Sequence, residues 1–335
     1  MTKLAVIGTT SWGTTLAVVL ARKGLDVWLW ARTAEVAEEL ESRRENSPIL
    51  PGIRFPDNLR VTHNIDRALK SASAVIFAVP SQSMRRNAEA LAGRMEASSA
   101  LISAAKGLEL STNLRMSQVL AEALDVPLSS VCVLSGPNLA GEMARGLPAA
   151  SVLASQRPLL AEKARHLLSC NGFCIQVSDD VTGVELSGSL KNVIALGAGV
   201  ADGLALGDNA KALLVTQGWG EITALGMAMG AKESTFSGLA GLGDLYATCA
   251  SPLSRNHYYG EQLAKGRTLA QIMDSTPHVA EGIPTTRAAY ELSRDLRVDM
   301  PIIRLMYGLL FEDLPPHKAV DELMAITARI AGKVA

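Results

Sequence analysis

The sequence predicts a two-domain α/β protein, with a doubly wound, mostly parallel β-sheet followed by an all-α C-terminal domain. Its 335 residues exceed the size at which a single hydrophobic core usually stops growing. Short apolar runs alternate with amphipathic stretches over the first half of the chain. Beyond about residue 180, long helical patterns follow without strand-like alternation. We therefore expect one domain at residues 1–180 and a helical domain at residues 181–335.

The strands are expected where short β-branched or apolar runs occur. Five such runs lie at residues 3–8, 26–30, 74–79, 100–104 and 131–135. Amphipathic stretches typical of helices lie between them, at residues 15–23, 84–95 and 115–123. Two further strands are expected at residues 150–153 and 173–177, with a helix at 158–170 between them. Alternation of this kind implies parallel strands with helices on both faces, and ligands at the carboxyl ends of the strands.

The composition indicates a folded protein and argues against several functional classes. Hydrophobic residues make up 48% of the chain and charged residues 19%, so disorder is not expected. The formal net charge is -1 and no long block of like charges occurs, so we expect no nucleic-acid partner. The first apolar run is short and ends at Gly8, which predicts a cytoplasmic protein without a signal peptide or an integral membrane segment.

The cysteines indicate neither disulfides nor a metal site. The chain has four, irregularly spaced, at Cys132, Cys170, Cys174 and Cys249. Cys170 and Cys174 could form half of a metal site, but no further Cys or His cluster completes it. We expect Cys170 and Cys174 to be buried structural residues, and we predict no metal.

A glycine-containing turn follows the first predicted strand directly. The segment Gly8-Thr9-Thr10-Ser11-Trp12-Gly13 opens a helix, which is the context that a Rossmann-like dinucleotide-binding turn requires. Gly8 allows the sharp turn, Gly13 allows close packing of helix and strand, and the helix N-terminus offers N–H groups to an anion. Arg32 follows the second strand, where a basic residue can bind the 2′-phosphate of NADP. NAD or NADP is the predicted cofactor, and a structural turn and an ordinary surface arginine are the alternatives.

Five ordered motifs resemble bacterial NAD(P)-dependent glycerol-3-phosphate dehydrogenase. They are Lys106-Gly107-Leu108-Glu109, Ser135-Gly136-Pro137-Asn138-Leu139-Ala140, Leu190-Lys191-Asn192-Val193, Gly238-Leu239-Ala240-Gly241-Leu242-Gly243-Asp244-Leu245 and Ser254-Arg255-Asn256. The resemblance runs essentially from end to end. It implies interconversion of dihydroxyacetone phosphate and sn-glycerol 3-phosphate with NAD(P)H, which supplies glycerol 3-phosphate for phospholipid synthesis. It also implies a small phosphorylated substrate, and a homodimer is plausible.

The resemblance implies roles for individual residues. Lys191 would transfer the proton, and Lys106 would assist it. Asp244 would contact either the substrate hydroxyl groups or the lysines, with helix capping as the alternative. The other implied substrate contacts are Gly136, Asn138, Ser254, Arg255 and Asn256. The implied cofactor contacts are Gly8, Ser11, Trp12, Gly13, Arg32, Lys106, Ala140, Arg255, Val279 and Glu281.

Physical chemistry supports the assignment of Lys191 independently. Hydride addition to a carbonyl carbon leaves negative charge on the oxygen, which a positioned ammonium can stabilise and protonate. Lys191 interrupts the apolar stretch at residues 186–196, where burying an unpaired ammonium is costly. An ordinary surface lysine therefore fits this position poorly.

Three positions depart from the pattern of the family. Thr10 stands where the second glycine of the turn usually lets the backbone approach the pyrophosphate, so we expect it to affect cofactor affinity. Gly141 replaces a usual lysine, and Gln217 replaces a frequent arginine. Two alternatives stay open at this point: a related dehydrogenase of another hydroxy acid or phosphosugar, and a non-catalytic nucleotide-sensing scaffold.

Overall fold

The computed structural model describes residues 1–96, 98–251, 254–276 and 280–334, with side chains as far as residue 328. The chain forms two compact units. The first contains Met1–Lys106 and Leu114–Glu185, and the second contains Gly107–Asn113 and Leu186–Ala335.

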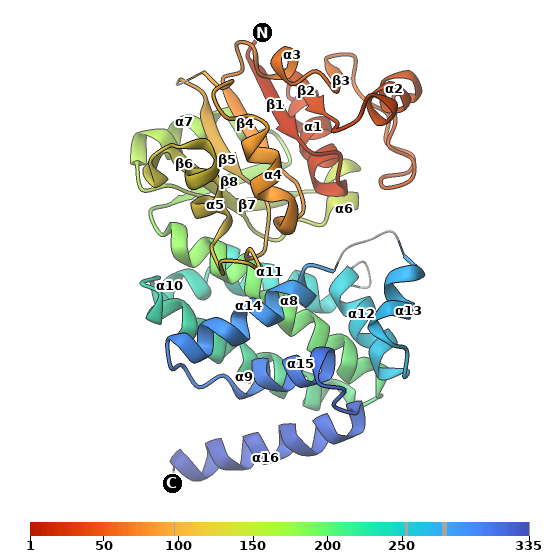
Figure 1. Ribbon diagram of the computed structural model, residues 1–335, viewed down its shortest axis with the longest axis vertical. Coiled ribbons are helices and arrows are strands. Elements are labelled where there is room, and N and C mark those ends of the chain that lie inside the picture. Colours follow the sequence, from red (N-terminus) through yellow and green to blue (C-terminus); the bar gives the residue numbers. More distant parts are fainter. Residues whose placement is uncertain (97, 252–253, 277–279, 335) are drawn as a thin grey trace. The chain divides into compact units, whose positions relative to one another are not determined.

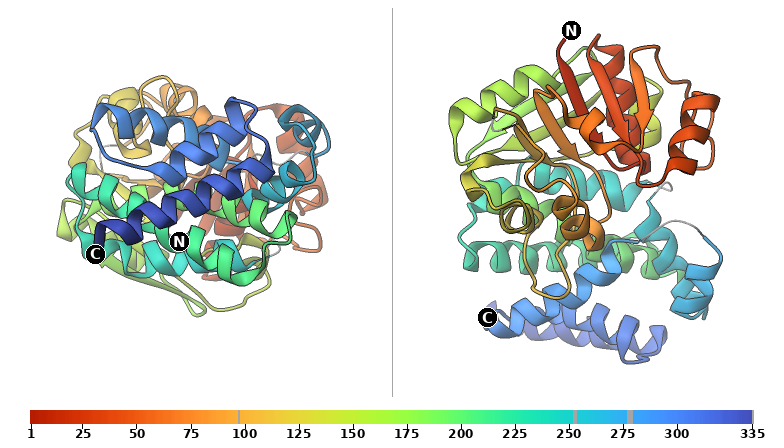
Figure 2. Two further views of the ribbon diagram at one scale, coloured as in Figure 1. Left: turned by 90° about the horizontal axis from the view of Figure 1, so that it is seen from below. Right: turned by 45° about the horizontal axis from the view of Figure 1, so that its top comes forward.

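The first unit is built on an eight-stranded sheet of order β3-β2-β1-β4-β5-β6-β7-β8 (Figure 1). The strands are β1 (Lys3–Ile7), β2 (Asp26–Trp30), β3 (Leu59–Thr62), β4 (Ala74–Phe77), β5 (Ala100–Ser103), β6 (Val131–Ser135), β7 (Ala149–Ala154) and β8 (Phe173–Ser178). All neighbouring pairs are parallel except β6 and β7. The right view of Figure 2 shows the red and orange strands of this sheet side by side.

Helices cover both faces of the sheet because its strands are apolar on both sides. The helices are α1 (Ser11–Arg22), α2 (Ala34–Arg43), α3 (Ile65–Leu69), α4 (Met84–Glu89), α5 (Met116–Leu124), α6 (Ala140–Ala144) and α7 (Pro158–Leu168). Leu4 and Val6 of β1 pack in one core with α1, α2, α6 and α7. Ala5 and Ile7, which point the other way, pack in a second core with α3, α4 and α5.

This architecture confirms the predicted fold class, with local differences. Residues 59–62 form β3, a four-residue strand at the edge of the sheet that was not expected. The helix expected at residues 84–95 ends at Glu89. The antiparallel pairing of β6 with β7 makes the sheet mostly, rather than wholly, parallel.

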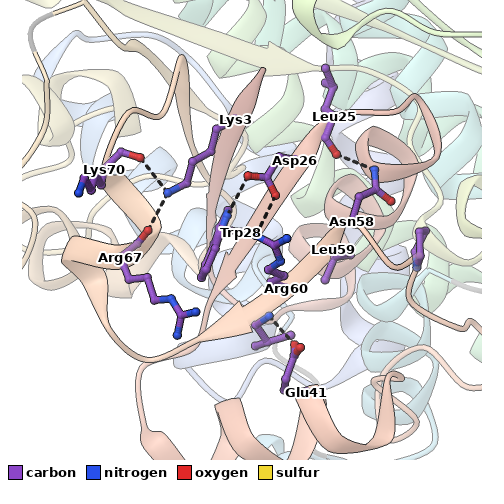
Figure 3. A network of polar contacts seen from close by, with 12 residues as sticks. Lys3, Leu25, Asp26, Trp28, Glu41, Asn58, Leu59, Arg60, Arg67 and Lys70 are labelled. Atoms are coloured by element: carbon purple, nitrogen blue, oxygen red, sulfur yellow. Dashed lines mark hydrogen bonds and ion pairs between the residues drawn. The ribbon is translucent and has the colours of Figure 1, made fainter. Parts of the chain in front are cut away.

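Cations surround Trp28 near the amino ends of β1 and β2 (Figure 3). The Lys3 ammonium lies 4.7 Å from the indole centroid, and the Arg67 guanidinium lies 4.9 Å from it. Lys3 also donates to the carbonyl oxygens of Arg67 (2.7 Å) and Lys70 (2.8 Å), at the C-terminal end of α3. The cluster fixes α3 at the end of the sheet opposite to the ligand-binding carboxyl ends of the strands.

The second unit is helical in its described residues (Figure 1). Its helices are α8 (Val181–Gly203, of which Leu186 onward belongs to this unit), α9 (Gly207–Ala228), α10 (Glu233–Phe236), α11 (Asp244–Ala250), α12 (Arg255–Ala264), α13 (Leu269–Asp274), α14 (Gly282–Asp295), α15 (Pro301–Phe311) and α16 (Pro316–Val334). A π-helical turn, Leu239–Gly243, precedes α11. Buried Leu, Ile and Met side chains from several of these helices form one core, to which α8 contributes Leu190, Ile194 and Leu196.

One buried carboxylate in this unit predicts a pH effect on stability. Glu221 of α9 accepts hydrogen bonds from the main-chain N–H groups of Ile302 (2.7 Å) and Ile303 (3.1 Å), in the first turn of α15. Burial raises the pKa of Glu221 from 4.5 to about 8, and Asp299 adds to the rise. Between these values the folded protein holds a proton that the unfolded chain releases, so raising the pH favours unfolding. We expect Glu221→Gln to reduce the loss of stability between pH 6 and 8 by about 1 kcal/mol per pH unit.

Urea unfolding at a series of pH values measures this effect. The comparison is the difference in unfolding free energy between the wild type and Glu221→Gln, because other titrating groups cancel in it. A difference that does not change between pH 6 and 8 would contradict the prediction.

Three further observations concern membrane-spanning helices, metal sites and the cysteines. No helix in the described ranges is both long and apolar enough to span a membrane. Among the same residues, no group of three or more His, Cys, Asp or Glu side chains is placed to hold a metal ion. All four cysteines are free thiols. Cys170 is half-buried and Cys174 is exposed, so the expected burial of these two side chains is wrong.

Candidate active site

The turn between β1 and α1 requires glycine at two positions. Gly8 has φ +110°, and a Cβ there would lie 2.7 Å from Val79 Cγ1 and 2.9 Å from the carbonyl oxygen of Ala78. A Cβ on Gly13 would lie 2.1 Å from the carbonyl oxygen of Gly8. Both glycines therefore keep β1, β4 and α1 close together at the carboxyl end of the sheet.

Thr10 caps α1 from within the turn. Its hydroxyl accepts a hydrogen bond from Gly13 N (3.0 Å) and donates one to the carbonyl oxygen of Ala78 (2.7 Å). The side chain thus attaches the turn to the residue directly after β4, which a glycine could not do. The expected effect of Thr10 on cofactor affinity stays a prediction.

The start of α1 fits the phosphates of a dinucleotide. The N–H groups of Ser11 and Trp12 are the first two of the helix, so they have no acceptor within it. Free N–H groups at a helix N-terminus are suited to bind an anion. The indole N–H of Trp12 is buried and has no hydrogen-bond partner among the described residues. A bound ligand could supply that acceptor.

Other predicted residues of the first unit lie just beyond the carboxyl ends of its strands. Arg32 is exposed and follows β2 by two residues. Lys106 follows β5 by three residues, and its ammonium donates to the carbonyl oxygen of Gly136, directly after β6, at 2.8 Å. Parallel strands end at one edge of the sheet, so these cations and the turn after β1 share that edge.

The loop after β6 is held against β7. Gly136 has φ +153°, and a Cβ there would lie 2.9 Å from Ser151 Cα. The Asn138 Oδ1 atom accepts from the Ser151 hydroxyl (2.7 Å), and its Nδ2 atom donates to the carbonyl oxygen of Ala150 (3.3 Å). Ala140 begins α6, and its carbonyl oxygen accepts from the Thr15 hydroxyl (3.1 Å). Asn138 thus stabilises this loop, and the buried Ser151 was not singled out in the sequence.

The second unit contains a buried ion pair between two predicted catalytic residues. Lys191 on α8 is 5% exposed and Asp244 on α11 is 1% exposed. Lys191 Nζ lies 2.5 Å from Asp244 Oδ1, and it also donates to the Thr248 hydroxyl. That hydroxyl donates in turn to the carbonyl oxygen of Asp244 (2.7 Å). The ammonium is buried as expected, but it is paired rather than isolated, and the carboxylate stabilises its charge.

This geometry bears on the roles left open for Asp244, whose part in substrate binding stays a prediction. The carboxylate contacts a lysine, and its side chain is not a helix cap. Thr248 was missed because it acts from the next turn of α11, at i+4 from Asp244. A hydroxyl one turn after a predicted acidic residue is the signal that could have found it.

The predicted phosphate-binding residues lie at the start of α12. Ser254 is the N-cap, and its hydroxyl accepts from His257 N at 3.3 Å. Arg255 is exposed and interacts through its charge with Glu281, which precedes α14. A guanidinium beside a helix N-terminus is suited to a phosphate, because both provide hydrogen-bond donors. Val279, a predicted cofactor contact, lies outside the described residues.

Asn256 joins three helices of the second unit. Its Nδ2 atom donates to Asn192 Oδ1 (2.9 Å), and its Oδ1 atom accepts from Gly282 N (3.0 Å). Asn192 follows Lys191 on α8, so the bond links the predicted phosphate segment to the helix of the lysine. A Cβ on Gly199 of α8 would lie 2.0 Å from the carbonyl oxygen of His257 on α12. Main-chain contact thus also fixes α12 against α8.

Comparison with protein families decides how these features are interpreted. A profile described as the N-terminus of NAD-dependent glycerol-3-phosphate dehydrogenase matches residues 3–161, and one for the C-terminus matches residues 180–321. The chain belongs to the NAD-dependent glycerol-3-phosphate dehydrogenase family. The resemblance seen in the sequence motifs is thereby confirmed.

Individual relatives within the glycerol-3-phosphate dehydrogenase family match almost the whole chain. A curated protein of Dehalococcoides mccartyi named glycerol-3-phosphate dehydrogenase [NAD(P)+] is 50% identical, over 99% of this chain and 94% of its own length. One of the same name from Streptomyces griseus is 45% identical, over 98% and 97%. The crystal structure of a glycerol-3-phosphate dehydrogenase from Coxiella burnetii superposes with a TM-score of 0.91 at 35% identity, covering 96% of this chain and 98% of that one.

Proposed function

We propose that this chain catalyses the NAD(P)H-dependent interconversion of dihydroxyacetone phosphate and sn-glycerol 3-phosphate, and so supplies glycerol 3-phosphate for phospholipid synthesis. The observation that carries the proposal is the buried ammonium of Lys191, held by Asp244 and Thr248. An ammonium fixed in this way is suited to act on a developing alkoxide. Membership of the family identifies the reaction that needs it.

In this proposal Lys191 transfers the proton. The bound nicotinamide cofactor supplies or accepts the hydride at the substrate carbon. In reduction the electron pair of the C=O π bond moves to oxygen, and Lys191 gives that oxygen a proton; in oxidation it takes the proton back. Asp244 and Thr248 fix the direction of the ammonium, so that it needs little reorganisation during the reaction.

The first unit would hold the cofactor. The N–H groups of Ser11 and Trp12 would bind the pyrophosphate, with Gly8 and Gly13 allowing its approach. Arg32, exposed after β2, would accept the 2′-phosphate of NADP. Lys106 and Ala140 of the same unit would make further cofactor contacts. The contacts implied for Arg255, Val279 and Glu281, which belong to the second unit, stay predictions.

The proposed substrate contacts follow from the resemblance of the motifs. Ser254, Arg255 and Asn256 would hold its phosphate, and Gly136, Asn138, Lys106 and Asp244 would contact its glycerol part. Asp244 and Asn138 also bond within the protein, so both would orient neighbouring groups in addition to contacting the substrate. The segment Ser254–Asn256 distinguishes a phosphorylated substrate from a neutral one.

A steady-state assay tests the proposed function. We expect dihydroxyacetone phosphate to be reduced with NADH and with NADPH, and dihydroxyacetone without phosphate to be a poor substrate. Comparable kcat/KM for the two ketones would favour a dehydrogenase of another substrate. Absence of NADH or NADPH binding in a fluorescence titration would favour the non-catalytic scaffold.

Arg255→Lys tests the phosphate assignment. Lysine keeps the charge but loses the planar fork of donors, so we expect KM for dihydroxyacetone phosphate to rise about tenfold. KM for unphosphorylated dihydroxyacetone should not change, and KM for NADH is measured in parallel. The control is Arg304→Lys, at an exposed position on α15. Equal KM changes for both ketones would exclude Arg255 from phosphate binding.

The cellular setting belongs to the same proposal. We expect the enzyme to act in the cytoplasm as a homodimer, as the resemblance to bacterial enzymes implies. Cell fractionation and light scattering of the purified protein test these two expectations.

A further inference from the structure

We propose that Asn46, which no motif of the sequence singles out, is a positioning residue for the dinucleotide-binding turn. The inference rests on the proposed function, because it assigns Asn46 to the binding of the cofactor. Asn46 itself need not contact the cofactor. It would act by fixing the main chain that does.

The side chain of Asn46 spans the turn. Its Nδ2 atom donates to the carbonyl oxygen of Thr9 at 3.1 Å and to the hydroxyl of Thr14 at 2.9 Å. Thr9 immediately precedes the cap residue Thr10, and Thr14 lies in the first turn of α1. The N–H groups of Ser11 and Trp12, proposed to bind the pyrophosphate, lie between these two attachment points. One carboxamide therefore fixes both ends of the segment.

Burial raises the free-energy cost of losing these hydrogen bonds. Asn46 is 4% exposed, and Thr14 is fully buried. Water cannot readily replace a lost donor at such a site, so the carbonyl oxygen of Thr9 and the hydroxyl of Thr14 would lose hydrogen bonds that solvent does not restore. The turn would then relax away from the geometry in which its N–H groups converge on an anion.

Asn46 is itself held in place by its own loop. Its carbonyl oxygen accepts from the N–H groups of Ile49 (3.1 Å) and Leu50 (2.7 Å). Leu50, Ile53 and Phe55 are buried in the core that also contains α1. The loop after α2 is thus a packed support that presents one amide group to the turn.

Thr10 holds the same turn from its other side, through Gly13 N and the carbonyl oxygen of Ala78. Three hydrogen bonds therefore attach this segment to its surroundings. Thr10 donates to Ala78, directly after β4, and Thr9 and Thr14 accept from Asn46 in the loop after α2. Thr10 replaces the second glycine of the usual dinucleotide-binding turn. These hydrogen bonds would keep the turn rigid and ready to bind the pyrophosphate.

The experiment compares the NADH dissociation constant of the wild type and Asn46→Ala by quenching of tryptophan fluorescence. We expect about a tenfold weaker affinity, corresponding to the loss of about one net hydrogen bond in positioning. Thr14→Val removes only one of the two acceptors and should weaken binding less. In the double variant the two effects should not add, because both act through Asn46. KM for dihydroxyacetone phosphate should stay within about twofold of the wild type in all variants.

Asn58→Ala is the matched control. The Asn58 Nδ2 atom also donates two hydrogen bonds, to the carbonyl oxygens of Ala21 and Leu25, both at 2.7 Å, at the other end of α1 (Figure 3). This variant should lose stability without losing more than about twofold in NADH affinity. If Asn46→Ala fails to fold, as judged by circular dichroism, Thr14→Val carries the comparison.

Two kinds of failure are distinguishable. A wild type that binds NADH but does not reduce dihydroxyacetone phosphate contradicts the proposed function alone. A wild type that turns over normally, with Asn46→Ala binding NADH as well as Asn58→Ala does, overturns the role of Asn46. A wild type that binds neither NADH nor NADPH overturns both.

Discussion

Lys191→Met is expected to lower kcat for dihydroxyacetone phosphate reduction by about two to four orders of magnitude, the usual share of general acid–base catalysis. Methionine fills much of the buried space of Lys191 but carries no proton to transfer. The NADH dissociation constant should stay near that of the wild type, because α8 contributes no proposed cofactor contact. Stopped-flow measurement of NADH oxidation, together with fluorescence titration, separates the two quantities.

A structural effect of this substitution must be distinguished from a catalytic one. Removing the ammonium leaves the carboxylate of Asp244 buried without its cation, which destabilises the second unit. The double variant Lys191→Met/Asp244→Asn removes that charge and should fold better while staying inactive. Lys265→Met is the control, because the Lys265 ammonium also lies 2.5 Å from a carboxylate, that of Glu261, but is half exposed. Full turnover in a folded Lys191→Met would remove Lys191 from the mechanism.

Local patterns predicted most of the sheet and the turn. Gly8 and Gly13 were recognisable because a short apolar run, a glycine turn and a helix start lie within a few residues of one another. The strand β3 was missed because it has four residues and lies at the edge of the sheet, so its pattern is weak without its neighbour. Pairing with β2 stabilises it, and pairing is a tertiary property.

Sequence patterns predicted those site residues whose polarity differs from that of their neighbours in the chain. Lys191 was visible as a cation within an apolar helical pattern. Thr248 and Asn46 were not visible, because a hydroxyl or a carboxamide is unremarkable in sequence and acts here through a partner 57 or 32 residues away. Such roles follow from hydrogen bonds that only the folded chain contains.

Arg115→Met is expected to reduce the unfolding free energy of the first unit by about 3 kcal/mol or more, because it leaves a buried carboxylate without its cation. Arg115 Nη1 lies 2.5 Å from Glu185 Oε2, and both residues are buried. The carboxylate also accepts from Ser117 N (2.8 Å) and the Ser117 hydroxyl (2.6 Å), at the start of α5. Urea denaturation followed by circular dichroism measures the change in unfolding free energy. If the first unit unfolds before the second, its unfolding appears as a separate step in the denaturation curve.

Two comparisons determine whether the isolated charge is the cause. The double variant Arg115→Met/Glu185→Gln removes the net charge and retains an acceptor for Ser117, so it should be more stable than Arg115→Met alone. Arg94→Met breaks the exposed Arg94–Asp66 pair, which has a separation of 2.8 Å, and should cost at most about 1 kcal/mol. If Arg94→Met and Arg115→Met were equally destabilising, desolvation of Glu185 would not be the reason. Glu185 and Lys191 both lie on α8. A stability loss in Arg115→Met without a change in kcat would show that these two positions of the helix act independently.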